Sequence, residues 1–77
     1  PVKLTSAELQ LMRILAANPG TTFTRTDLSQ RMGAVLERTV DVQITRLRRK
    51  IENDPKLPLY LQTVRGVGYV LMPDRVG

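Results

Sequence analysis

Five basic side chains gather between residues 38 and 50, the densest concentration of charge in the sequence. Only Asp41 opposes them, so this segment carries +4 of the +5 net charge of the 77-residue chain. Such a concentration indicates a polyanionic partner, either nucleic acid or an acidic membrane surface. The chemistry that these residues offer is binding by charge, and the five are Arg38, Arg46, Arg48, Arg49 and Lys50.

Helical geometry divides this segment into two faces. At about 100° per residue, Ile44, Leu47 and Ile51 fall within roughly 40° of Val40 and form an apolar stripe for a core. Arg48 lies at the flank, beside the edge of that stripe. The opposite face, roughly 140° to 260° from Val40, carries Arg38, Thr39, Val42, Thr45, Arg46 and Arg49.

Val42 is an apolar residue on the basic face. A face that needs only to be soluble mixes charges of both signs and gains nothing from an exposed valine. A helix that enters the major groove of DNA uses both kinds of residue, because arginine pairs bidentately with guanine O6 and N7 while thymine presents a methyl group. The valine among the arginines therefore predicts binding in the major groove.

Residues for catalysis or metal binding are absent or scattered. The chain has no cysteine and no histidine, and its carboxylates lack metal-ligand spacing, so we expect no metal, no cofactor and no enzyme activity. Asp41 is expected to complement the dipole at a helix N-terminus and to pair with a basic side chain. Gly66 and Gly68 lack the context of a phosphate-binding loop, and both are expected to adopt positive φ in a hairpin turn.

Start and stop signals predict a first helix from about Ser6 to Ala17. Thr5 and Glu8 have the spacing of a capping box, and Asn18-Pro19-Gly20 ends the helix. Its apolar series is Leu9, Met12, Leu15 and Ala16.

Two further helices and a hairpin complete the predicted fold. Phe23 is read as a short extended anchor; the second helix starts at Thr24 with Asp27 and ends at Gly33. The third helix runs from about Glu37 to Asn53, and residues 59–72 contain two β-favouring runs around a glycine turn. The expected fold class is α+β, a winged helix-turn-helix of three helices plus a C-terminal β-hairpin in one domain, residues 1–77.

The stretches ERTVDVQITRLRRKIENDP and LQTVRGVGYV resemble the effector domain of OmpR/PhoB-type two-component response regulators, which are bacterial transcription factors. The resemblance extends from LTSAEL through NPG to the hairpin, and it implies a recognition helix in the major groove and a wing in the minor groove of double-stranded DNA. The implied base contacts are Val42, Thr45, Arg46 and Arg65. The implied backbone contacts are Arg38, Thr39, Gln43, Arg48, Arg49, Thr63 and Tyr69.

The resemblance also implies partners and missing parts. It implies an N-terminal receiver domain phosphorylated on aspartate, contact with RNA polymerase, a cytoplasmic location, a monomeric isolated domain and a tandem dimer on direct repeats. The sequence departs from the family in its short loop, Gly33 to Leu36, and in lacking most of an N-terminal sheet, of which Val2-Lys3-Leu4 is the expected last strand. Because the chain starts at Pro1 without an initiator Met, we expect a fragment of a longer protein.

One other partner of the basic face stays open as an alternative. A winged-helix module can bind an acidic protein instead of DNA, and titration with random-sequence duplex would separate the two. Binding to an anionic membrane is disfavoured because no apolar face accompanies the arginines. No apolar run approaches the roughly 20 residues of a membrane span, and no signal peptide opens the chain, which favours a soluble protein.

Overall fold

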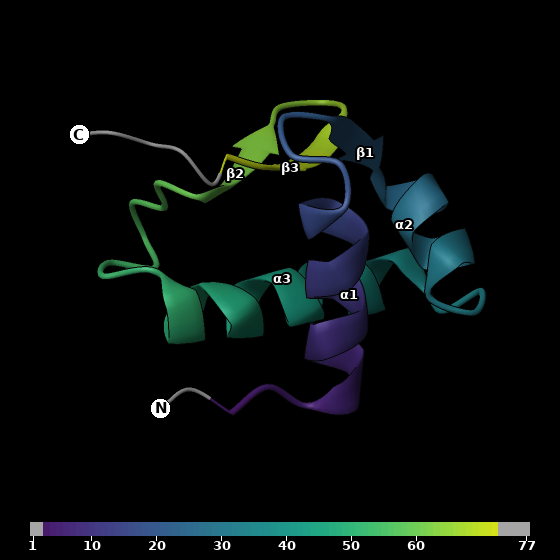
Figure 1. The fold of residues 1–77 in the computed structure, drawn as a ribbon. Helices are drawn as coiled ribbons and strands as arrows, with labels where there is room; N and C mark the ends of the chain where they lie inside the picture. The colour runs from purple at the N-terminus through teal and green to yellow at the C-terminus, as the bar shows by residue number, and fades with distance from the viewer. Residues whose placement is uncertain (1–2, 73–77) are drawn as a thin grey trace.

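The computed structural model describes residues 3–72, in which three helices and three short strands surround one core (Figure 1). In chain order these are α1 (Ser6–Ala16), β1 (Thr22–Thr24), α2 (Arg25–Arg31), α3 (Glu37–Ile51), β2 (Leu61–Val64) and β3 (Gly68–Leu71). The predicted three helices and C-terminal hairpin are confirmed. The expected N-terminal strand is wrong for Lys3 and Leu4, which belong to no strand, and Val2 lies outside the described residues.

The strands form one antiparallel sheet in the order β1-β3-β2. The predicted hairpin pairs Leu61 with Leu71 at its base and Thr63 with Tyr69 nearer its turn. The expected anchor Phe23 is more than a connector, because it pairs with Tyr69 and adds a third strand to the hairpin. The wing is therefore joined on one edge to the segment that leads into α2.

The two glycines of the wing have different roles. Gly66 has φ +74°, as predicted for a turn glycine. The expectation of positive φ is wrong for Gly68, whose constraint is steric: a Cβ there would lie 1.8 Å from the carbonyl oxygen of Phe23. Gly68 thus permits β1 and β3 to approach each other.

The start of α1 is fixed by the predicted capping box. The Thr5 side chain accepts a hydrogen bond from the Glu8 amide, and the Glu8 carboxylate accepts one from the Thr5 amide at 2.8 Å. The same carboxylate, 1% exposed, accepts a hydrogen bond from Lys50 Nζ of α3 at 2.5 Å. The Lys50 hydrogen bond and then the Thr5 amide lower the pKa of Glu8, and the ion pair fastens α1 to the end of α3.

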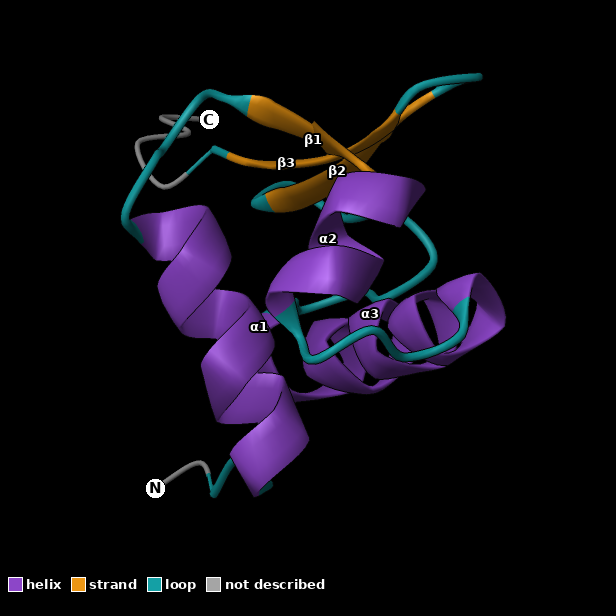
Figure 2. Cartoon of the chain, turned by 90° about the vertical axis from the view of Figure 1, so that its right-hand side faces the viewer, coloured by secondary structure: helices purple, strands orange, loops and turns teal. Residues whose placement is uncertain are grey.

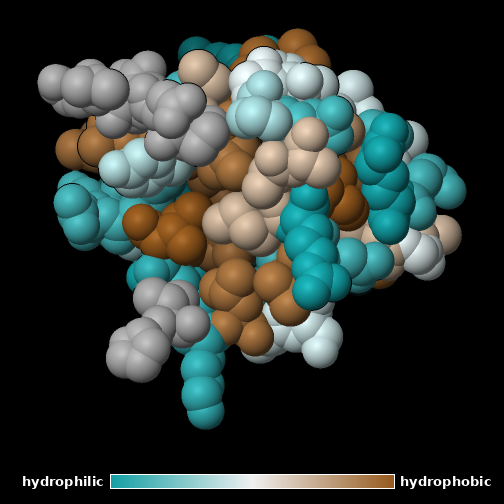
Figure 3. Space-filling view, in the orientation of Figure 1, coloured by the Kyte–Doolittle hydropathy of each residue, from teal (hydrophilic) through white to brown (hydrophobic). Residues whose placement is uncertain are grey.

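The predicted apolar series of α1 is partly wrong. Leu15 is buried as expected, but Leu11 is the other fully buried leucine, while Leu9 is 39% exposed and Ala16 is exposed. The stripe that faces the core consists of Glu8, Leu11 and Leu15. A pattern of apolar residues alone misplaces this stripe because one of its positions is a carboxylate. Figure 3 shows that apolar residues also gather on the surface, in the middle of the face on which α1 lies.

The helix-turn-helix follows its predicted signals at most of its ends. The Thr24 side chain caps α2 by accepting the Asp27 amide at 3.0 Å, and Gly33 turns the chain with φ +94°. The last turn of α3 is shorter than predicted and ends at Ile51 rather than Asn53. Glu52 leaves the helix because its buried carboxylate accepts the three successive amide hydrogens of residues 59–61.

The core lies between the three helices and one face of the sheet (Figure 2). It is aliphatic, as expected, with Phe23 as its buried aromatic residue. The predicted stripe of α3 is confirmed, since Val40, Ile44 and Leu47 are at most 1% exposed. Ile51, its fourth predicted member, is half-buried and packs against the core. Burial of this stripe fixes the rotation of α3 about its own axis.

We expect the two wing glycines to differ in their sensitivity to substitution. Gly66→Ala should lower the free energy of unfolding by about 1 kcal/mol, because alanine is strained at positive φ. Gly68→Ala should cost clearly more, because its methyl group would collide with the Phe23 backbone and separate β1 from β3. Urea unfolding of both variants measures the difference, and equal losses would contradict the close approach at Gly68.

Candidate nucleic-acid interface

The outward face of α3 consists of the residues predicted from helical pitch. Arg38, Thr45, Arg46 and Arg49 are exposed, and Thr39 is half-buried. The Val42 side chain is 46% exposed, outside the core. The structure thus confirms an apolar side chain placed among arginines on a surface.

The turn of the wing protrudes on the same side of the molecule. In Figure 2 both α3 and the tip of the hairpin lie on the side away from α1. Arg65 and Gly66 are exposed at this tip, and Val67 is 49% exposed. A turn held by the Val67 amide and the Val64 carbonyl at 2.9 Å presents Arg65 to solvent.

A cleft lies between the wing and the first residues of α2 and α3. It has a volume of about 350 Å³ and is lined by hydroxyl, charged and backbone groups, including Thr24, Thr26, Thr63, Glu37 and Tyr69. From α3, Glu37 of the first turn contributes to its lining. It is open to solvent, and the two valines that line it, Val64 and Val67, are half-buried and exposed respectively.

Arg48 lies at the flank of α3, where its half-buried side chain faces the wing. Its Nε donates to the Leu61 carbonyl at 2.9 Å and its Nη2 donates to Thr63 Oγ1 at 2.8 Å. The guanidinium also lies over the Tyr69 ring, 5.7 Å from the centroid. Burial lowers the pKa of Arg48. Because a guanidinium has five N–H donors, three remain after these bonds for a further acceptor.

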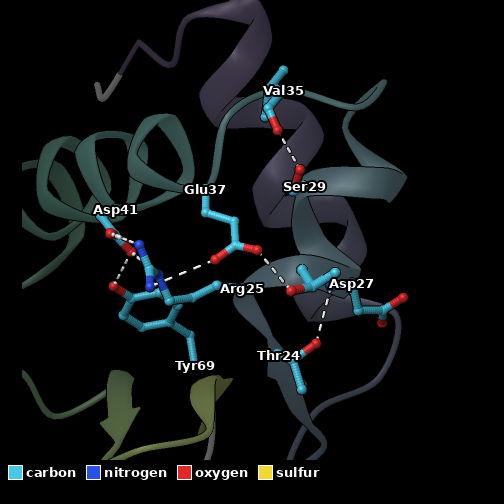
Figure 4. A network of polar contacts seen from close by, with 9 residues as sticks. Thr24, Arg25, Asp27, Ser29, Val35, Glu37, Asp41 and Tyr69 are labelled. Carbon is cyan, nitrogen blue, oxygen red and sulfur yellow. Dashed lines mark hydrogen bonds and ion pairs between the residues drawn. The ribbon is translucent and has the colours of Figure 1, made fainter.

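Asp41 joins three elements in the network drawn in Figure 4. Its carboxylate accepts hydrogen bonds from Arg25 Nε at 3.0 Å, from Arg25 Nη2 at 2.7 Å and from the Tyr69 hydroxyl at 2.7 Å. Arg25 also lies 3.6 Å from a carboxylate oxygen of Glu37. The predicted pairing of Asp41 with a basic side chain is confirmed, and its partner comes from α2.

The network changes how its members ionise. The hydrogen bond and charge of Asp41 raise the pKa of Arg25. Burial first, and then the hydrogen bond to Asp41, raises the pKa of Tyr69 to about 12. Tyr69 therefore stays protonated at neutral pH and remains a donor to Asp41.

Two predicted contact residues are partly enclosed by the protein. Gln43 is half-buried, and its Oε1 is a buried side-chain atom without a hydrogen-bond partner among the described residues. Tyr69 is half-buried, with its hydroxyl directed at Asp41. Sequence patterns could not reveal these positions, because the groups that enclose them come from other elements. The sequence likewise did not predict that Arg25 pairs with Asp41. The signal for such a pairing was Asp41 itself, the single acid among the basic residues of the segment 38–50.

Other kinds of site find no support within residues 3–72. No group of three residues of metal-ligating type lies together there. In the same range, no helix has both the length and the apolar character needed to cross a membrane.

Known proteins share this arrangement. The family described as "Transcriptional regulatory protein, C terminal" matches residues 1–71. Response regulator DrrB of Thermotoga maritima, described as an OmpR/PhoB homologue, has 37% sequence identity and a TM-score of 0.86, over 92% of this chain and 34% of that one. This chain belongs to the OmpR/PhoB family of response-regulator effector domains.

Two further family members show how much of a regulator this chain corresponds to and what one of them binds. Protein PetR of Rhodobacter capsulatus is 55% identical over 96% of this chain and 35% of its own length. The chain thus spans about a third of that curated relative. The DNA-binding domain of Klebsiella pneumoniae RstA, solved in complex with the RstA box, has 33% identity and a TM-score of 0.85, over 94% of this chain and 75% of that one.

The opposite placement of two valines on α3 gives a matched test of the interface geometry. Val40→Ala should lower the free energy of unfolding by about 2 kcal/mol, because it removes buried methyl groups and leaves a cavity. Val42→Ala should change it by less than about 0.5 kcal/mol, because that side chain is on the surface. Thermal or urea unfolding measures both, and a large loss for Val42→Ala would show that its side chain is part of the core.

Proposed function

We propose that this domain binds specific sequences of double-stranded DNA as the effector domain of a two-component transcriptional regulator. The observation that carries the proposal is the outward face of α3, where exposed Val42 lies among arginines beside a wing that presents Arg65. A cationic and apolar helix face suits the major groove, which offers both guanine acceptors and thymine methyl groups. The DNA complex of RstA, a relative with the same fold, supports the proposal.

The contacts divide into those that read bases and those that fix position. Val42, Thr45 and Arg46 lie on the outward face of α3, and we assign them to base edges in the major groove. We assign exposed Arg65 to the minor groove, where a narrow A-T-rich groove attracts arginine. The backbone contacts that we assign are Arg38, Thr39, Gln43, Arg48, Arg49 and Thr63. Tyr69 is left out of this set because its hydroxyl hydrogen is donated to Asp41.

The cleft between α3 and the wing fits the path of the DNA backbone in this proposal. A protein that reads the major groove with a helix and the adjacent minor groove with a wing must leave room for the strand between them. The hydroxyls of Thr24 and Thr63 line this cleft and accept hydrogen bonds from Asp27 and Arg48, so each keeps a hydrogen that can be donated to a phosphate oxygen. The Thr26 hydroxyl donates to Glu37 instead. The domain performs no chemistry in this role and needs no cofactor.

The role of the complete protein is also a proposal. A receiver domain phosphorylated on aspartate would pair two effector domains on direct repeats in the bacterial cytoplasm, and RNA polymerase would be a further partner. By itself the domain would bind a half-site as a monomer. The turn between α2 and α3, residues 32–36, is short, so we do not assign a polymerase contact to it.

We expect binding to duplex DNA to depend steeply on salt. If about five phosphates are neutralised, the logarithm of the association constant should fall with the logarithm of salt concentration with a slope of roughly −4 to −5. Fluorescence anisotropy with random duplex, and then with a duplex selected from a randomised pool, measures the slope and the preference. No binding to either duplex at low salt, together with binding to acidic proteins, would instead support the protein-interaction alternative.

We expect two exposed arginines of α3 to have different effects on specificity. Arg46→Ala should cost roughly 1 to 3 kcal/mol on the selected duplex and relax the preference at one base pair, because arginine pairs bidentately with guanine. Arg49→Ala is the matched control; it should weaken binding to all duplexes alike and reduce the salt slope by about 1. Equal losses on selected and random duplexes for both variants would contradict this division of roles.

A further inference from the structure

Asp41 is a carboxylate on the helix that we propose enters the groove of a polyanion. It is the single acid among the basic residues of the segment 38–50, and like charge repels phosphate. A bystander acid at this position would weaken DNA binding. Its three hydrogen bonds, two to Arg25 and one to Tyr69, indicate that the carboxylate has a structural use that outweighs this repulsion.

One hydrogen bond of Asp41 reaches the wing at Tyr69, where the burial of the hairpin decreases toward its turn. The base of the hairpin is anchored in the core, because Leu61 and Leu71 are buried. Nearer the turn, Thr63 is exposed and Val64 is half-buried. The outer part of the wing is held by the pairing of β1 with β3 and by the partly buried Tyr69 ring, and polar contacts with α3 add to these in fixing its position.

Tyr69 receives two such contacts from α3. Its hydroxyl donates to Asp41, and its ring lies beneath the guanidinium of Arg48. Arg48 also donates to Leu61 and Thr63 of the neighbouring strand. Asp41 and Arg48 are seven residues apart, about two helical turns or about 10 Å along one flank of α3. Two attachments at that separation define an orientation, whereas a single one would allow rotation about it.

We propose that Asp41, Tyr69 and Arg48 form a clamp that sets the orientation of the wing relative to α3. This inference rests on the proposed function, and it makes Asp41 and Tyr69 positioning residues. The clamp holds Arg65 at the distance from α3 at which base reading in the major groove and contact in the minor groove occur together. The Tyr69 hydroxyl then acts through Asp41, which is a different role from donating to a phosphate.

Asp41→Ala separates positioning from simple electrostatics by the sign of its effect. Removing this carboxylate also releases Arg25, so electrostatics alone should strengthen binding to the selected duplex. The clamp predicts the reverse, a loss of about tenfold, corresponding to the lost charge-assisted hydrogen bonds. Glu37→Ala is the matched control, because it removes the same charge from the first turn of the same helix without touching Tyr69; it should strengthen binding.

Tyr69→Phe tests the clamp without changing charge or ring packing. It should weaken binding to the selected duplex severalfold and reduce the penalty of Arg65→Ala when the two substitutions are combined, because a misplaced wing benefits less from Arg65. Additive losses in this double-mutant cycle would overturn the clamp. If circular dichroism shows that Asp41→Ala does not fold, the Tyr69→Phe cycle alone tests the clamp.

A readout without DNA distinguishes failure of the clamp from failure of the proposed function. Residual dipolar couplings of the amides in 61–71, relative to those in α3, should change in Tyr69→Phe. Unchanged couplings, or tighter DNA binding by Asp41→Ala, would overturn the clamp while leaving the proposed function intact. A wild-type domain that ignores duplex DNA would end the proposed function, whereas the couplings would still report whether these residues orient the wing.

Discussion

Burial of Val40, Ile44 and Leu47 is the constraint on which the rest of the domain depends. These three side chains enter the core from one stripe of α3, so the helix cannot rotate without exposing them to water. With about 3.6 residues per turn, a helix held by one face must present the opposite face to solvent. The exposed valine and arginines are thus placed by the packing of residues that never contact a partner.

Buried carboxylates extend this constraint to the elements around α3. The Glu8 carboxylate accepts hydrogen bonds from the Thr5 amide at the start of α1 and from Lys50 at the end of α3. The Glu52 carboxylate accepts hydrogen bonds from the amides of residues 59–61. Each of these acids is almost fully buried, and each has the hydrogen-bond donors that make a buried charge tolerable. Both contacts lie at the C-terminal end of α3, where they connect this helix to α1 and to the start of the wing.

The periodicity of the sequence predicted features that form within one continuous segment, and it missed contacts between segments that are distant in the sequence. The stripe of α3, its outward face and the hairpin follow from local spacing, which is why they were predicted correctly. The pairing of β1 with β3, the buried position of Glu8 and the steric need for Gly68 arise between segments distant in the sequence. The hydrogen bonds of Arg48 with Thr63 and of Tyr69 with Asp41 are also contacts between distant segments. A helical wheel places Arg48 at a flank of its helix but does not show what packs against that flank.

The arginines near the interface serve two different purposes. Within residues 3–72 no hydrogen bond or ion pair engages the side chains of Arg38, Arg46, Arg49 and Arg65, so these cations are free to meet an anionic partner. Arg25 and Arg48, in contrast, donate hydrogen bonds to other residues of the protein. A surface of unpaired cations would attract any polyanion, since charge alone carries no sequence information. Discrimination requires that base-reading groups be held in register, and in the clamp that we propose this register depends on Arg48, a cation that is engaged within the protein. In this proposal, arginine provides affinity for DNA where it is exposed and fixes the geometry of the interface where it is engaged.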